Sequence, residues 1–355
     1  MTARFRTTGR LATAAALLAA VVSFQAPARA QPAMPAQALC ERQIAIKAPV
    51  PAAKEPAGRP ADLVGSFGFP CAAGADAVLP VVLMLAGSGP TDRDGNQPGL
   101  RTDLLRMLAE DLAVRGVASL RVDKRGIGAS RTAIADEALM TIDLLAADAA
   151  QWVRAARKLA GDAPVIVLGH SEGGLIALLA ARREAPDAIV LAATPGEPAV
   201  RTLERQLAQA PMPDDLRRRA GRILAQLTAG RNVADVPLEL APLFRPSVQP
   251  YLISWLGIDP ATVLEGFAGP VLILQGDRDL QVTTADARRL AAGRPRGTRI
   301  EILAGLNHVL KPAPAERAAN IAAYTTPGLR PDPRVAMLIS AFAGSGATPS
   351  GPPVK

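Results

Sequence analysis

Short apolar runs alternate along this chain with longer segments whose apolar positions recur at helical spacing. Runs such as 81–87 (VVLMLAG), 117–123 (VASLRVD) and 164–170 (PVIVLGH) are dominated by apolar residues, which is typical of strands buried on both faces. Further strands are predicted at 63–69, 187–195, 270–279 and 299–305. Helices are predicted at 100–115, 141–159, 172–183, 284–292 and 334–342.

This alternation of strand and helix predicts the fold class. Consecutive parallel strands need crossover connections, and helices in those connections cover both faces of the sheet. We therefore expect an α/β protein with a mostly parallel sheet between two helical layers. The pattern is interrupted at about 199–262, where helix-like stretches and several prolines occur without a convincing strand. This segment is predicted to be a helical lid, inserted into a single α/β domain at 61–343.

Both ends of the chain differ in composition from this domain. Residues 1–30 combine early arginines with an apolar run at 11–24 and a small-x-small cleavage site, which predicts a cleaved export signal. The run is shorter than the roughly 20 residues of a membrane span, so we expect no membrane insertion after cleavage. An Ala/Pro-rich lead-in at 31–60 is predicted to be extended and poorly ordered, and a Gly/Pro/Ser-rich tail at 344–355 to be flexible. The mature protein would be periplasmic or secreted.

Composition and charge give no support for a nucleic-acid partner or a metal. The chain carries a net charge of +8, but residues 1–30 hold four arginines and no acidic residue, so the mature part carries +4. Its basic residues form no stripe of the kind that nucleic-acid binders present. The chain has 2 histidines, too few for a three-histidine catalytic metal site, and we expect neither a metal nor a cofactor.

Cys40 and Cys71 are the two cysteines of the chain. An oxidising compartment favours a disulfide between them. The alternative is that both are unpaired small hydrophobic residues. A bridge would close a loop of 31 residues, for which loop-closure entropy predicts a stabilisation of roughly 3–4 kcal/mol.

The segment 169–174 (GHSEGG) lies where the strand at 164–170 meets the next helix. G-x-S-x-G at such a junction is the pattern of a nucleophile elbow, a strained turn that projects the serine hydroxyl above the sheet. Glycine two residues to either side avoids collisions with the neighbouring strand and helix. A chance occurrence in an Ala/Gly-rich chain is the alternative, and the position at a strand end argues against it. Ser171 is therefore the candidate nucleophile.

A serine nucleophile needs a base, and His170 and His308 are the two candidates. His170 neighbours Ser171 on the tight turn, so its side chain is expected to point away from the attacking oxygen. His308, just after the last strand, becomes the candidate base; its alternative role is that of a structural surface histidine. Asp279 is preferred to Asp277 as the orienting carboxylate, because it lies further toward the loop where the groups would meet. The order Ser171, Asp279, His308 is that of the α/β-hydrolases.

An oxyanion hole would complete the site. One donor is expected to be the backbone N–H of Glu172, which directly follows the nucleophile. The second is expected to be the N–H of Ser88, in the loop after the strand at 81–87. Gly87 and Gly89 flank Ser88 and would let the loop approach the acyl carbon closely.

The same loop resembles two unrelated motifs. Gly87-x-Gly89 lacks the third glycine of a dinucleotide fingerprint. Asp92-x-Asp94-Gly95 resembles the start of a calcium loop, but its glycine comes too early and no bidentate Glu closes it. We interpret this segment as a turn that braces the rim of the site.

Four motifs together resemble bacterial α/β-hydrolases close to the exported esterase and serine-aminopeptidase-like group. They are GHSEGG, DKRGIGAS after a strand, QGDRD and a late NHVLK. The resemblance covers roughly residues 63–342 and implies a Ser–His–Asp triad at Ser171, His308 and Asp279.

The resemblance also bears on two loops. It implies a structural turn at 123–130, in which Arg125 braces the neighbouring loops. Ala86 stands where many relatives have a histidine before the oxyanion glycine, which leaves the choice between Gly87 and Ser88 as the second donor open.

The motifs predict a serine hydrolase that cleaves small to medium acyl esters through an acyl-enzyme and needs no cofactor. A thioesterase would use the same triad. An aminopeptidase or peptidase would need an acidic pocket for the free amino group of its substrate. The acidic candidates within the insertion are Glu204, Asp214, Asp215, Asp235 and Glu239. A ligand-binding protein on a hydrolase fold is the non-enzymatic alternative, and an intact triad argues against it.

One tyrosine and one tryptophan stand at i and i+4 in the insertion, at Tyr251 and Trp255. They are candidates for the lining of an acyl pocket. Simple packing of the lid is an equally good interpretation.

Overall fold

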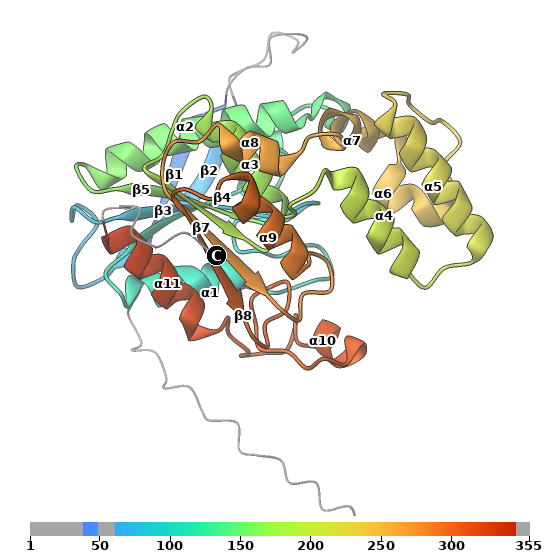
Figure 1. Cartoon of the computed structure of the whole chain (residues 1–355). Coiled ribbons are helices and arrows are strands. Elements are labelled where there is room, and N and C mark those ends of the chain that lie inside the picture. Colours follow the sequence, from blue (N-terminus) through green and yellow to red (C-terminus); the bar gives the residue numbers. More distant parts are fainter. Residues whose placement is uncertain (1–37, 49–60, 346–355) are drawn as a thin grey trace, which may run out of the picture. The chain divides into compact units, whose positions relative to one another are not determined.

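Eight strands form one mixed sheet in the computed structural model, which describes residues 38–48 and 61–345 (Figure 1). The strands are β1 (Leu39–Lys47), β2 (Asp62–Pro70), β3 (Val81–Leu85), β4 (Ala118–Val122), β5 (Val165–His170), β6 (Ala188–Ala192), β7 (Val271–Gly276) and β8 (Thr298–Leu303). Their order across the sheet is β1-β2-β4-β3-β5-β6-β7-β8. The pairs β1–β2 and β2–β4 are antiparallel and all the other pairs are parallel.

Helices cover both faces of this sheet (Figure 1). Buried residues of α2, α3, α8 and α9 pack on one face, and those of α1 and α11 pack on the other. The α-helices are α1 (Leu104–Ala113), α2 (Ile142–Ala160), α3 (Glu172–Ala181), α4 (Ala199–Gln209), α5 (Asp214–Thr228), α6 (Ala241–Phe244), α7 (Gln249–Trp255), α8 (Pro260–Glu265), α9 (Thr284–Gly293), α10 (Arg317–Ala322) and α11 (Pro333–Gly344). Short 3₁₀ helices are η1 (Gly128–Ala133), η2 (Glu137–Leu139), η3 (Leu238–Leu240) and η4 (Pro246–Val248).

The central strand β3 shows why the apolar runs are uninterrupted. Val81, Leu83 and Leu85 belong to the hydrophobic cluster on one face. Val82 and Met84 belong to the cluster on the opposite face. Because successive side chains of a strand point to opposite faces, a strand covered by helices on both sides needs apolar residues at every position. The predicted fold class, a mostly parallel sheet with helices on both faces, is confirmed.

The first strand corrects one prediction. β1 lies inside the segment 31–60, for which we expected a poorly ordered lead-in, and that expectation was wrong for residues 39–47. β1 pairs with β2 along its whole length, and a disulfide joins Cys40 to Cys71 just beyond the end of β2. Its side chains are half-buried or exposed, so the strand lacks the apolar run that identifies the others.

Helices α4 to α8 lie between β6 and β7, in the segment for which an insertion was predicted. Buried residues of α4, α5, α6 and α7 build a hydrophobic cluster of their own. The expected end of the insertion at 262 was too late, because Ala261 and Leu264 of α8 already pack in the main core. The predicted export signal and tail lie outside the described residues, apart from positions 344 and 345. Within the described ranges, no helix is both long and apolar enough to cross a membrane.

Candidate active site

Ser171 occupies the sharp turn between β5 and α3. Its backbone has φ 55° and ψ −123°, a conformation that L-residues rarely adopt. The flanking glycines allow this turn. A Cβ at Gly169 would lie 2.3 Å from the carbonyl oxygen of Gly173, and one at Gly173 would lie 2.3 Å from that of Leu85. Strand, helix and the end of β3 therefore approach too closely for any other residue, which is the geometry expected of a nucleophile elbow.

Asp279 and His308 meet beyond the ends of β7 and β8. The Nδ1 atom of His308 lies 2.8 Å from Oδ2 of Asp279. The other oxygen of Asp279 accepts hydrogen bonds from the N–H groups of Gln281, at 2.7 Å, and Val282, at 3.0 Å. Because a carboxylate accepts, Nδ1 of His308 carries the proton in the neutral imidazole, and Nε2 is left as the basic atom.

The electrostatic environment keeps Asp279 ionised. Burial by itself raises the pKa of this carboxyl group. The charge and hydrogen bond of His308 and the N–H groups of Val282 and Gln281 outweigh burial, so the pKa of Asp279 lies below its usual value. Asp277 has a different place, since its carboxylate accepts a hydrogen bond from the N–H of Gly305 at 2.7 Å. It braces the turn after β8.

Ser171 and His308 line one cavity of about 80 Å³, together with Gly87, Ser88 and Tyr324. Between these two described residues there is no direct hydrogen bond, and such contacts often form only when a substrate is bound. The structure thus brings together the three side chains that the sequence analysis selected, with the carboxylate–imidazole bond formed.

His170 has a position that the sequence analysis missed. Its Nε2 lies 2.8 Å from the carbonyl oxygen of His308. A carbonyl can only accept, so His170 is the tautomer with the proton on Nε2, and it fixes the backbone that carries the candidate base. Burial, with a smaller effect of the neighbouring His308, lowers the pKa of His170 to about 4. It is neutral at pH 7. No sequence signal indicates this contact, because its acceptor is a backbone atom 138 residues away.

The low pKa of His170 predicts a pH dependence of stability. Between the folded-state pKa of about 4 and the ordinary value of 6.5, the unfolded chain takes up a proton that the folded chain does not. This contribution to the free energy of unfolding is fully present above pH 6.5 and is lost as the pH falls toward 4. We expect this component to fall by roughly 2 to 3 kcal/mol between about pH 7.5 and about pH 4.5. His170→Gln, which keeps a donor but does not titrate, should lack this component. Urea unfolding of both proteins at the two pH values measures it, and equal pH dependence would refute the assignment.

The loop after β3 lies directly over the elbow. A Cβ at Gly87 would lie 3.1 Å from the Cβ of Ser171. The carbonyl of Ser88 accepts hydrogen bonds from Oγ1 of Thr91, at 2.7 Å, and Nε2 of Gln97, at 3.1 Å. Glu172 is the first residue of α3, so its N–H is one of those that no intrahelical carbonyl accepts. The two candidate oxyanion donors, Ser88 and Glu172, therefore lie on two segments that meet at Ser171.

A second cavity, of about 670 Å³, adjoins the first and shares Ser88 with it. Tyr251 and Trp255 line this cavity, and their rings pack 5.9 Å apart between centroids. Both residues also pack against the hydrophobic clusters. The two interpretations of this pair, cavity lining and packing, are thus both compatible with where the residues lie.

The side chain of Glu172 is buried beside the larger cavity. It is 2% exposed, and within the described part of the chain neither of its carboxylate oxygens has a hydrogen-bond partner. The ammonium of Lys124 lies 3.8 Å from Oε1. Burial raises the pKa of Glu172, while Lys124 and the nearby Tyr251 hydroxyl oppose that rise.

Arg125 braces neighbouring segments through hydrogen bonds, as the family resemblance implies. Arg125 donates two hydrogen bonds to the buried Asp148, at 2.9 and 2.5 Å, and one to the carbonyl of Ala133, at 2.6 Å. The turn at 123–130 is thereby tied to α2 and η1.

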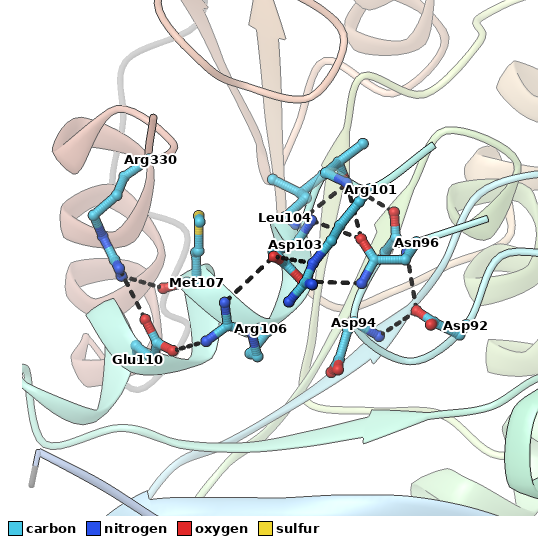
Figure 2. A network of polar contacts seen from close by, with 12 residues as sticks. Asp92, Asp94, Asn96, Arg101, Asp103, Leu104, Arg106, Met107, Glu110 and Arg330 are labelled. Atoms are coloured by element: carbon cyan, nitrogen blue, oxygen red, sulfur yellow. Dashed lines mark hydrogen bonds and ion pairs between the residues drawn. The ribbon is translucent and has the colours of Figure 1, made fainter. Parts of the chain in front are cut away.

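The acidic loop at 92–95 is held by hydrogen bonds to groups of the same chain, as Figure 2 shows. Oδ1 of Asp92 accepts the N–H groups of Asp94 and Asn96, both at 2.9 Å. Nδ2 of Asn96 donates to Asp103, which also pairs with Arg101 and Arg106. No group of three or more His, Cys, Asp or Glu side chains in the described ranges is arranged to hold a metal ion. The loop is a brace at the start of α1.

The chain is similar to several known proteins in sequence and in fold. A family model described as Serine aminopeptidase, S33 matches residues 102–241. Esterase EstD from Thermotoga maritima is 26% identical over 65% of this chain and 55% of its own length, so the chain spans about half of that relative. Among solved structures, Est1E from Butyrivibrio proteoclasticus with bound ferulic acid has a TM-score of 0.53 and 16% identity, and the match covers 81% of this chain and 96% of that one. A thermophilic esterase from Thermogutta terrifontis has a TM-score of 0.50 and 17% identity, over 86% of this chain and 100% of that one.

The sheet order, the elbow after β5 and these structural matches define an α/β-hydrolase fold. The chain has this fold, and the resemblance to the esterase and serine-aminopeptidase-like group that its motifs predicted is confirmed.

Proposed function

We propose that this protein is a serine hydrolase that cleaves carboxylic esters with small to medium acyl groups through an acyl-enzyme. The observation that carries the proposal is the strained turn at Ser171, which shares a cavity with an imidazole whose Nδ1 is bonded to a buried carboxylate. A serine in this conformation has its hydroxyl at the top of the sheet, where a base can reach it. The similarity to a protein named as an esterase supports the same activity.

The proposed reaction has two stages. Nε2 of His308 takes the proton of the Ser171 hydroxyl as the serine oxygen attacks the ester carbonyl. Asp279 stabilises the imidazolium that forms. The N–H groups of Ser88 and Glu172 bind the negative oxygen of the tetrahedral intermediate. When the intermediate collapses, the C–O bond to the alcohol breaks and His308 gives the alcohol its proton. Water then attacks the acyl-enzyme by the same steps and releases the acid and the free serine.

The size of the larger cavity supports the proposed substrate class. At about 670 Å³ it lies within the usual range of small-molecule sites. Its apolar lining comes partly from the insertion between β6 and β7, which contributes Leu203, Leu243, Val248 and Leu252, and partly from earlier segments of the chain. We propose that this insertion acts as a lid and that Tyr251 and Trp255 line the acyl pocket.

An aminopeptidase is the second candidate, because the matching family model carries that name. Such an enzyme must bind a free ammonium group. The five acidic residues of the insertion that could do so are all exposed, and none of them lines the larger cavity: Glu204, Asp214, Asp215, Asp235 and Glu239. Glu137 and Glu172 do line it, but Glu137 is paired with Arg245, and Oε1 of Glu172 lies 3.8 Å from the ammonium of Lys124. These placements favour an ester over a peptide.

We also propose that the protein is exported. The disulfide between Cys40 and Cys71 supports an oxidising compartment, where such bonds persist. The predicted signal at 1–30 has the composition that export requires.

The substrate proposal predicts a ranking of rates. On p-nitrophenyl esters of increasing chain length, we expect kcat/KM to peak at short to medium acyl chains and to fall for long ones. On aminoacyl-anilides we expect kcat/KM at least about 100-fold lower, since both carboxylates that line the cavity already lie beside cations of the protein, Glu137 beside Arg245 and Glu172 beside Lys124. A preference for the anilides would instead identify an aminopeptidase.

A further inference from the structure

Lys124 makes an unusual contact with the loop that lies over Ser171. It directly follows Asp123 at the end of β4, and its Nζ donates hydrogen bonds to the carbonyl oxygens of Gly87, at 2.6 Å, and Gly89, at 2.8 Å. The side chain is only 12% exposed. A buried ammonium thus binds the carbonyl oxygens of the two glycines that flank Ser88.

The contact with Gly87 determines the direction of the next N–H. The carbonyl of Gly87 and the N–H of Ser88 belong to one planar trans peptide group, in which they point in opposite directions. While Lys124 holds this carbonyl, the N–H of Ser88 must point away from the ammonium. Turning the peptide over would break a charge-assisted hydrogen bond and bring a carbonyl oxygen, which repels an oxyanion, to the position of the donor.

The next peptide group of the loop is held separately, by other side chains. The carbonyl of Ser88 accepts hydrogen bonds from Thr91 and Gln97, so three consecutive carbonyls of the loop are bound by side chains. Only the Gly87 carbonyl shares its peptide group with the N–H of Ser88.

Glu172 completes the arrangement on the other side of the site. Its carboxylate lies 3.8 Å from Nζ of Lys124, and its backbone N–H is the other proposed oxyanion donor. Burial lowers the pKa of Lys124, and the charge of Glu172 opposes that lowering and helps to keep the ammonium protonated. The position beside Lys124 thereby gives the buried carboxylate a role.

We propose that Lys124 is a positioning residue, which holds the peptide between Gly87 and Ser88 so that the N–H of Ser88 faces the acyl oxygen of the bound substrate. This inference rests on the proposed function. It also selects Ser88 over Gly87 as the second donor, because the grip of Lys124 fixes the peptide group that contains the N–H of Ser88.

Lys124→Met removes the ammonium at nearly the same length, and its effect separates positioning from general stability. Loss of one oxyanion donor costs roughly 100- to 1,000-fold in kcat. We expect kcat per titrated active site to fall about 100-fold on a p-nitrophenyl ester, with KM changed less than about threefold. The inhibition constant of a trifluoromethyl ketone, which forms an oxyanion adduct with the serine, should rise by a similar factor of about 100.

Two further variants keep the test decisive. Lys124→Met leaves the carboxylate of Glu172 unpaired, so the double variant Lys124→Met/Glu172→Gln is measured as well, and it should show the same loss in kcat and in ketone affinity. Thr91→Val is the matched control. It removes a donor from the next carbonyl of the same loop, whose peptide group carries no proposed oxyanion donor. It should lower kcat no more than about threefold.

The outcomes distinguish this inference from the proposed function. If the wild-type protein hydrolyses esters and the double variant folds, yet kcat and the ketone inhibition constant stay within about threefold of wild type, Lys124 does not position the donor. The same conclusion holds if Thr91→Val loses as much as the lysine variants. A wild-type protein without ester hydrolysis and without ketone inhibition would instead overturn the proposed function.

Discussion

Replacing Ser171 with alanine is expected to lower kcat on a p-nitrophenyl ester by about 10⁵-fold or more. Ser171 carries the hydroxyl at the elbow, and removal of the nucleophile of such a triad abolishes nearly all of its rate enhancement. Steady-state kinetics at saturating substrate measures the loss.

A second replacement at this position separates chemistry from folding. With φ 55°, residue 171 is strained as alanine but not as glycine. Ser171→Gly should therefore be as inactive as Ser171→Ala while melting at a higher temperature. Substantial activity in either variant would show that another residue attacks the ester.

Replacing Asp279 with asparagine is expected to lower kcat by about 10⁴-fold, the size of effect typical for this member of a serine triad. The amide nitrogen of asparagine would donate a hydrogen bond to Nδ1 of His308. This favours the tautomer with its proton on Nε2, and Nε2 can then no longer accept the serine proton. The loss should appear in kcat with little change in KM.

Asp277→Asn provides the matched control in the same turn. Asp277 accepts a hydrogen bond from the N–H of Gly305, whereas among the described residues it is Asp279 that bonds His308, so the Asp277 amide variant should lose less than about threefold in kcat. If the Asp277 variant were the more severely affected of the two, the assignment of the carboxylate would be wrong.

The fold was predictable where burial dictates the sequence. Strands such as β3 and β5 are covered on both faces, so every position is apolar and the pattern identifies them. The elbow was predictable for a related reason. The close approach of Gly169 and Gly173 to neighbouring backbone excludes any side chain at these positions. Both must be glycine, and this requirement is visible in the sequence as the G-x-S-x-G spacing.

Other features of the fold have no recognisable pattern in the sequence. β1 is held by pairing with β2 and by a disulfide, neither of which demands apolar residues, so a strand appeared where disorder was expected. His170 and Lys124 both bind backbone carbonyls of distant segments. Any residue type can carry such an acceptor, and only the folded chain shows which carbonyl a side chain reaches.

Part of the candidate site was likewise predictable from the sequence, and part of it was not. Asp279 was preferred to Asp277 from its distance along the turn, and it is Asp279 that bonds His308. The larger cavity depends on how the insertion packs over the sheet, which helical periodicity alone does not determine. The residues that line it could therefore be named only in part, as Tyr251 and Trp255.

The account depends on a serine that is activated by an imidazole at the top of the sheet. Fluorophosphonate labelling followed by peptide mass spectrometry tests this most directly, because the reagent reacts covalently with activated serines and requires no knowledge of the substrate. We predict a single adduct on the peptide that carries Ser171, absent in Ser171→Ala and formed far more slowly in His308→Gln. Failure of the folded wild-type protein to react, or equally rapid labelling of the His308 variant, would contradict the account.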